Sequence, residues 1–143
     1  MTYKFLEDFS IADVAFEAEG SNLEELFLSS ALALTNTMVK DLDKIETKVE
    51  REIKVEDSSL EMLLFNFLQE IIFYKDAERL IFSHYDIKIE KNFDKYRLYC
   101  LAKGEELDMK KHELLVDVKA VTMHYYEVIF SEGKWKARIV LDV

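Results

Sequence analysis

Two neighbouring carboxyl groups at the end of the chain are the groups best placed to do chemistry. They are the side chain of Asp142 and the terminal carboxylate of Val143. The residues before them read as two strands folded on a turn at 131–134, which is expected to hold this end in a fixed position. Two carboxylates so close together repel each other unless water or a cation compensates. Because such oxygen ligands suit calcium, magnesium or manganese better than a thiophilic metal, the chain end is a candidate cation site.

A third carboxylate of interest, Asp13, lies near the beginning of the sequence. It falls in a stretch, residues 12–18, that alternates well enough to form a strand ending at Gly20. Its neighbours are small or apolar, and an unpaired carboxylate buried among them would be penalised. From the residues alone, two interpretations remain open: a turn or edge aspartate that faces water, and a ligand or catalytic carboxylate.

Other kinds of catalytic site find little support in the sequence. The three histidines, His84, His112 and His124, lack the spacing of a zinc motif. No nucleophile elbow is present, and the lone Cys100 is expected to be a buried, inert thiol. With no proline and three glycines, the chain also offers no Gly-rich phosphate loop.

Composition limits the number of domains and the kinds of partner. The 143 residues fit one domain, residues 1–143. The formal net charge of −10 repels nucleic acid and favours cations or a basic partner, so direct nucleic-acid binding is not expected. Apolar runs are too short for a membrane span. No signal peptide is recognised and the single cysteine permits no internal disulfide, so a cytoplasmic location is expected.

Apolar periodicity predicts two helices among several strands. Ser21 and Glu24 have the spacing of a capping box, before a helix running to about residue 39. Ser58 and Glu61 repeat that spacing before a helix running to about residue 75, whose apolar stripe is broader, so it is expected to be the more buried of the two. Alternating residues predict strands at 3–6, 12–18 and 49–55, a hairpin of 80–91 with 96–102, and a final pair of 116–130 with 135–143.

Together these elements predict an α+β fold: a single domain in which a mostly antiparallel sheet packs with two main helices and ends in a C-terminal β-hairpin. If residues 132–133 form a two-residue turn, the pairing places Met123 opposite Asp142 and Thr122 opposite the last residue. Lys119 then lies at the start of the long strand, next to the chain end.

Several segments occur in a specific combination. Lys-Ala-Val-Thr-x-His followed by a strand with a penultimate aspartate is hard to obtain by chance. The segments are Tyr3-Lys4-Phe5-Leu6-Glu7, Ala12-Asp13, Leu23-Glu24-Glu25-Leu26-Phe27, Leu63-Leu64, Gly104-Glu105, His112, Val118-Lys119-Ala120-Val121-Thr122-Met123-His124 and Val140-Leu141-Asp142-Val143. In these segments the chain resembles the archease family from end to end.

The resemblance implies a small cytoplasmic activator that is not itself an enzyme. Its partner is expected to be the GTP-dependent tRNA-splicing RNA ligase, whose guanylylation and turnover archeases promote with a metal held by acidic residues. Asp13 resembles the first-motif aspartate of the family, and Asp142 and the Val143 carboxylate resemble its terminal ligands. The implied cofactor is a divalent metal ion, with calcium expected and magnesium or manganese as alternatives.

Three further residues match the family motif. Lys119 resembles the lysine of the Lys-Ala-Val-Thr segment, and a contact with a phosphate or with the partner is expected of it. Thr122 and His124 resemble supporting residues, although both also fit strand positions that fill a rim. The sequence departs from the family around Asp13, where the usual His-Thr-Ala-Asp-x-Gly lacks its histidine and glycine, so a hydrogen bond that orients the carboxylate is expected to be missing.

Two other functions remain open for this chain. It could be a metal-dependent phosphohydrolase that uses the same acidic site. It could also be an interaction or chaperone-like module that binds no metal.

Overall fold

The computed structural model describes residues 2–7 and 13–143. In chain order, its strands, two α-helices and one short 3-10 helix are β1 (Thr2–Leu6), β2 (Asp13–Gly20), α1 (Leu23–Met38), η1 (Leu42–Lys44), β3 (Val49–Asp57), α2 (Leu60–Glu78), β4 (Leu80–Asn92), β5 (Lys95–Glu106), β6 (Ala120–Ser131) and β7 (Lys134–Asp142). The α+β class and the C-terminal hairpin expected from the sequence are confirmed.

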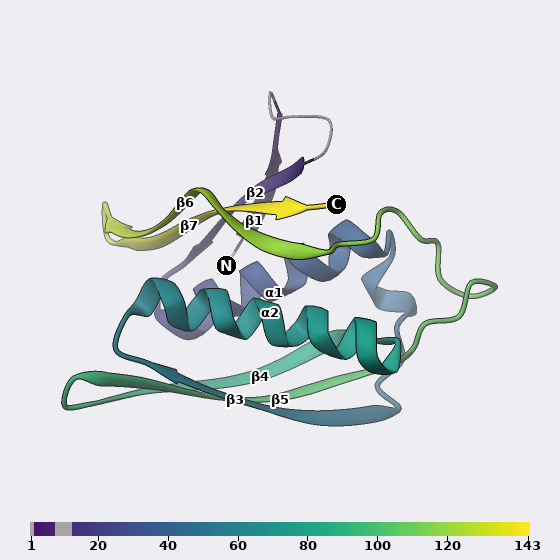
Figure 1. Cartoon of the computed structure of the whole chain (residues 1–143), viewed down its shortest axis with the longest axis horizontal. Helices are drawn as coiled ribbons and strands as arrows, with labels where there is room; N and C mark the ends of the chain where they lie inside the picture. Colours follow the sequence, from purple (N-terminus) through teal and green to yellow (C-terminus); the bar gives the residue numbers. More distant parts are fainter. Residues whose placement is uncertain (1, 8–12) are drawn as a thin grey trace.

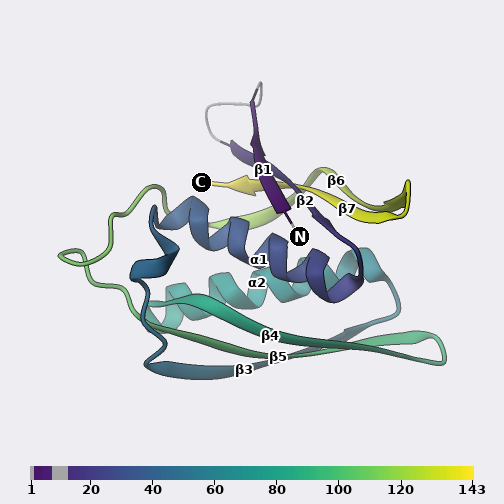
Figure 2. The ribbon, with the colours of Figure 1, turned by 180° about the vertical axis from the view of Figure 1, so that it is seen from behind.

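Two antiparallel sheets enclose the two helices. One sheet has the strand order β1-β2-β7-β6 and the other the order β3-β5-β4. Figure 1 shows α1 and α2 lying between the sheets, with α2 nearer the viewer, and Figure 2 shows the same layers from behind, with α1 in front. The sequence predicted one mostly antiparallel sheet, whereas the strands divide into two sheets because each packs an apolar face onto the helix layer.

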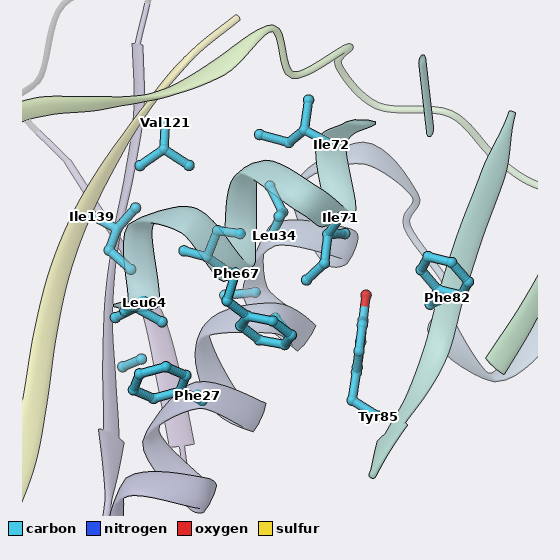
Figure 3. Close-up of a cluster of buried hydrophobic side chains, with 14 of the residues drawn as sticks. Phe27, Leu34, Leu64, Phe67, Ile71, Ile72, Phe82, Tyr85, Val121 and Ile139 are labelled. Carbon is cyan, nitrogen blue, oxygen red and sulfur yellow. The ribbon is translucent and has the colours of Figure 1, made fainter. Parts of the chain in front are cut away.

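The core lies in the helix layer and draws side chains from both sheets. Figure 3 shows Phe27 of α1 and Phe67 of α2 between Ile139 of β7 on one side and Tyr85 of β4 on the other. The rings of Phe27 and Phe67 stack with their centroids 6.0 Å apart. The Tyr85 hydroxyl is hydrogen-bonded to that of Thr35 at 2.8 Å, so the polar end of this buried side chain is satisfied.

The first helix, not the second, is the more buried, which corrects the sequence prediction. Ten of the 16 residues of α1 are buried, against seven of the 19 residues of α2. The greater burial of α1 is not evident from apolar periodicity, because several of its buried positions carry small or hydroxylated side chains. The hydroxyls of Ser30, Thr35 and Thr37 are satisfied by donating to backbone carbonyls one turn earlier, at Leu26, Ala31 and Ala33.

Both helices begin one residue later than the predicted capping boxes imply. Asn22 caps α1 by accepting a hydrogen bond from the Glu25 amide, and Ser59 caps α2 by accepting from the Met62 amide. At each start two successive polar residues can serve as the cap, and the second of them does so.

The connection from β5 to β6 begins and ends later than the predicted strands imply. β5 continues to Glu106, beyond the expected end at residue 102, and residues 107–119 form no regular strand, so the strand expected from 116 begins only at Ala120. The buried Glu105 carboxylate anchors this connection by accepting hydrogen bonds from the Glu46 amide at 2.7 Å and from Lys111 at 3.0 Å. His112 lies 3.1 Å from the same carboxylate.

Gly104 in β5 permits a close approach to the neighbouring strand β4. A Cβ atom at this position would lie 1.8 Å from the carbonyl oxygen of Ile81, beside a register shift between Phe82 and His84. We expect Gly104→Ala to lower the free energy of unfolding by about 2–3 kcal/mol, because backbone rather than a flexible side chain must move. Urea unfolding monitored by circular dichroism measures this.

Gly133→Ala is the matched control. Gly133 has φ +77° with no atom near its hypothetical Cβ, so its replacement carries only the cost of the left-handed backbone, about 1 kcal/mol. If both alanine variants lost the same free energy of unfolding, the close approach of Gly104 to Ile81 would not contribute to the loss.

Candidate metal site at the end of the four-stranded sheet

Asp13 and Asp142 lie directly opposite each other. Asp13 is the first residue of β2 and Asp142 the last residue of β7, and the antiparallel register pairs the two. Directly opposed residues of an antiparallel pair have Cα atoms about 4.5–5.5 Å apart, with their side chains on the same face of the sheet. Two carboxylates from opposite ends of the sequence are therefore neighbours.

Both side chains point away from the helix layer. Phe16 of β2 pairs with Ile139 of β7, and both are buried in the core. Side chains alternate along a strand, so Asp13 and Asp142, which are three residues from Phe16 and Ile139, lie on the outer face. Each is half-buried. Like charges in directly opposed positions destabilise a sheet, so this pair costs free energy in the absence of a compensating charge.

The third strand at this point is β6, which contributes Ala120 opposite Asp142. The Lys119 amide donates a hydrogen bond of 2.8 Å to the Asp142 carbonyl oxygen. The prediction that Lys119 adjoins the chain end is thus confirmed, and Figure 1 shows the C-terminus beside the beginning of β6. Ala120 has only a methyl group, so it places no large side chain opposite Asp142.

The predicted register of the hairpin is wrong at the site, although its turn is right. Ser131 pairs with Lys134 around Glu132 and Gly133, both with positive φ as a two-residue hairpin turn requires. The sequence then predicted Met123 opposite Asp142, but Ala120 occupies that position.

A bulge in β6 causes the difference. Between the pairs Glu127–Arg138 and Thr122–Val140, β6 advances five residues and β7 only two, so three extra residues are accommodated. Tyr125 in this bulge has φ 54°, and its carbonyl accepts a 2.9 Å hydrogen bond from the Arg138 side chain.

The bulge accounts for the positions of Thr122 and His124. The Thr122 hydroxyl donates to the Val140 carbonyl at 3.0 Å and accepts from the His124 amide at 3.2 Å. It therefore closes the bulge at the end nearer the aspartates. The His124 side chain is exposed, with its ring centroid 5.8 Å from that of Tyr125. Thr122 has a structural role in shaping β6, whereas His124 belongs to the exposed bulge.

The residues before Asp13 include those where the sequence departs from the family pattern. Residues 8–12, including the position of the missing histidine, lie outside the described residues. Ala15, at the position of the missing glycine, is 1% exposed and pairs with Val140. Its methyl group therefore packs into the outer face, two residues from the aspartate.

Sequence reasoning missed the contribution of Ala120 and Ala15 to the shape of the site. Ala120 belongs to the Lys-Ala-Val-Thr segment that carries the family resemblance, so its position next to Lys119 could have indicated that it lies near the site. Ala15 offered none beyond the alternation of its strand.

The carboxylate oxygens of Asp13 and Asp142 are suitable ligands for a hard divalent cation, which would need further oxygen ligands in addition to them. Within residues 2–7 and 13–143, no group of three or more His, Cys, Asp or Glu side chains is arranged to hold a metal ion. Asp13 and Asp142 supply two carboxylates, and the backbone continues from Asp142 to the half-buried Val143. Carboxylate and carbonyl oxygens are the ligands of calcium, magnesium and manganese.

The other reactive side chains have structural explanations. Cys100 is fully buried, and burial together with the nearby Asp86 charge raises the pKa of its thiol to about 12. The thiol is therefore protonated and inert, as expected from the sequence. His112 is buried against Glu105, on the connection between the two sheets.

Comparison with known proteins identifies the family. Residues 3–143 match the Archease protein family. The chain belongs to the archease family. It is 41% identical to the Protein archease of Pyrococcus abyssi over 133 residues, which cover 92% of this chain and 93% of that protein.

Solved archease-family structures share its fold. The solution structure of protein 1598 of Methanobacterium thermoautotrophicum superimposes with a TM-score of 0.85 at 35% identity, covering 99% of this chain and 98% of that one. A crystal structure from Thermotoga maritima, described as an archease and possible chaperone, gives a TM-score of 0.61 at 19% identity, with 96% of each chain covered. At that identity the second likeness supports the fold alone. In the described part of this archease, no helix is long and apolar enough to cross a membrane.

Proposed function

We propose that this archease is a non-catalytic, cytoplasmic activator of the tRNA-splicing RNA ligase, which it helps to become guanylylated and to turn over repeatedly. It would act through a divalent metal ion, with calcium expected and magnesium or manganese as alternatives. The ligands would be the carboxylates of Asp13 and Asp142 and the terminal carboxylate of Val143. The observation that carries the proposal is the register that sets Asp13 opposite Asp142 on the outer face of the sheet.

The surrounding residues suit a site that is presented to a partner. Ala120 places no large side chain opposite Asp142, and the Lys119 amide is hydrogen-bonded to the Asp142 carbonyl while the Lys119 side chain is exposed. Lys119 would contact a phosphate or a partner carboxylate. When bound, the cation would supply positive charge near the triphosphate of a nucleotidyl-transfer site. The protein residues hold and orient the site, and the ligase carries out the reaction.

Multiple-turnover RNA joining by the ligase tests the proposal. Asp13→Ala is expected to remove the stimulation, since it deletes one of two opposed ligands. Glu17→Ala is the matched control, because Glu17 is an outer-face carboxylate on the same strand, paired with Arg138. It is expected to leave stimulation unchanged. Full stimulation by Asp13→Ala would refute the role of Asp13.

A C-terminal extension tests the role of Val143. Adding a few glycines moves the terminal carboxylate away from Asp142 without changing any side chain. We expect cation affinity to fall about tenfold, a typical loss when the surroundings of a metal site are disturbed, with an unchanged melting temperature in chelator. Isothermal titration calorimetry measures the affinity. An extended protein that binds calcium as tightly as the original would show that the terminal carboxylate is not a ligand.

The same reagents distinguish the two alternatives. A phosphohydrolase would turn over a phosphoester in the absence of ligase when a divalent metal is added. A metal-free interaction or chaperone-like module would bind no calcium, magnesium or manganese at millimolar concentration in calorimetry.

A further inference from the structure

Lys75 is a nearly buried lysine on α2 beneath the start of β6. Its side chain is 10% exposed, and its ammonium group makes three contacts. These join it to the Asp117 carboxylate at 2.6 Å, the Val118 carbonyl at 2.7 Å and the Asp76 carboxylate at 2.5 Å. An ammonium group has three hydrogens to donate, so all of them find acceptors.

We infer that Lys75 is a positioning residue for the candidate metal site: by holding the backbone at residues 117–118, it fixes Lys119 and, through Lys119, the end of β7 at Asp142. This inference rests on the proposed function, since it concerns the same site. Lys75 itself belongs to a helix on the inner side of the sheet, so it acts through the segment that it holds.

Hydrogen bonds to α2 and β7 alternate along the entry to β6. The Val118 carbonyl accepts from Lys75, the Lys119 amide donates to the Asp142 carbonyl, and the Val121 amide donates to Gln69 of α2 at 2.8 Å. The segment is thus tied to the helix on both sides of its bond to Asp142. The fully buried Val118 and the buried Val121 add apolar contacts with the core.

The contacts of Lys75 are poorly explained by stability alone. Its partner carboxylates at Asp117 and Asp76 are 73% and 57% exposed, and pairs that reach into water contribute little. A buried ion pair as a whole can often be replaced by apolar residues of similar volume without loss of stability. Lys75 also lines a groove of about 480 Å³ with apolar walls at Met38, Leu115 and Val116. The ion pairs therefore explain little of why a lysine stands at this position, and the hydrogen bond to the Val118 carbonyl is its distinctive contact.

The charge of Lys75 is retained in the folded protein. Burial lowers the pKa of this side chain, but the carboxylates of Asp117 and Asp76 outweigh that effect and raise the pKa above its ordinary value. The ammonium group therefore keeps all three hydrogens around neutral pH.

Cation binding by Lys75→Met tests the inference, because the two possible roles have opposite signs. If Lys75 acted only as a positive charge, its removal would strengthen cation binding. If it positions Lys119 and Asp142, its removal weakens binding, and we expect a dissociation constant for calcium about tenfold higher in calorimetry. Lys110→Met, which removes an exposed lysine, is the control for net charge and is expected to bind as tightly as the unmodified protein or slightly more tightly.

Amide hydrogen exchange gives a second readout that needs no metal. We expect the Lys119 amide, which donates to Asp142, to exchange at least about tenfold faster in Lys75→Met, while amides in the centre of α1 keep their protection. Calcium affinity equal to or higher than that of the unmodified protein would overturn the inference, as would unchanged exchange at Lys119. If the unmodified protein bound no cation, the proposed metal site would fail, and exchange at Lys119 would still decide whether Lys75 holds the segment.

Discussion

Replacing Asp13 and Asp142 together by asparagine is expected to stabilise the metal-free protein while abolishing its response to calcium. The two carboxylates are directly opposed across β2 and β7, where like charges are unfavourable. Asparagine has nearly the same shape and no charge, so we expect the free energy of unfolding in chelator to rise by about 0.5–1 kcal/mol. A pair of residues that destabilises its own fold is expected where function requires it.

The double variant is expected to gain stability without metal but to lose the stabilisation by calcium. At a calcium concentration of 100 times its dissociation constant, a ligand that binds only the folded state stabilises it by about 2.7 kcal/mol. The unmodified protein is expected to show this gain in urea unfolding, and the double variant is expected to show none. Stimulation of the ligase should be lost in parallel.

Glu17→Gln is the control for the removal of an outer-face charge. Glu17 pairs with Arg138, an opposite charge, so this substitution should lower stability slightly and leave the calcium response intact. If the double asparagine variant were less stable than the unmodified protein in chelator, the aspartates would have a structural role. A calcium response retained by that variant would exclude them as ligands.

The juxtaposition of Asp13 and Asp142 could be anticipated from the sequence, but by resemblance rather than by pattern. Alternation predicts that each lies at the end of a strand, yet it does not show that β2 pairs with β7. That pairing joins residues more than a hundred positions apart, and no local signal selects it over other arrangements. The motif around Lys119 and the penultimate aspartate supplied the missing link.

The bulge in β6 could not be predicted because its causes are distant in sequence. Residues 122–126 are β-branched, aromatic or otherwise compatible with a regular strand. The bulge is held by Arg138 and the Val140 carbonyl, both on the partner strand. A count from the hairpin turn therefore gives the right turn and the wrong residue opposite Asp142.

The two sheets could not be separated from sequence for a similar reason. Strand alternation shows which side chains face the core, and both sheets present apolar residues to the same helix layer. The connection between them is anchored by Glu105, a buried carboxylate near the end of β5. Its burial follows from acceptor contacts with Glu46 and Lys111, which lie on other segments.

Replacing Glu105 by alanine is expected to be among the most damaging single changes to the fold. The backbone amide of Asp108 donates to His112 Nδ1 at 2.9 Å, so Nε2 carries the hydrogen and donates to Glu105. Alanine would leave this buried ring hydrogen and the Glu46 amide without their acceptor. We expect a loss of about 3–5 kcal/mol in the free energy of unfolding, measured with urea at pH 7.

Glutamine at position 105 separates the charge of this residue from its shape. Its amide oxygen can still accept from the Glu46 amide and His112, whereas the ion pairs of the carboxylate with Lys111 and Lys48 lose their negative partner, so a smaller loss of about 1 kcal/mol is expected at pH 7. Burial raises the pKa of Glu105, but the hydrogen bonds from Lys111, the Glu46 amide and His112 outweigh it and lower the pKa from 4.5 to about 2.

The lowered pKa makes the contribution of Glu105 depend on pH. The deprotonated carboxylate stabilises the fold fully above pH 4.5, and this contribution is lost as the pH falls toward 2. The stability difference between the unmodified protein and Glu105→Gln should therefore be constant near neutrality and narrow between those two values. A difference that stayed constant down to pH 2 would show that the charge of Glu105 does not stabilise the fold, and that its hydrogen-bonding shape alone anchors the connection between β5 and β6.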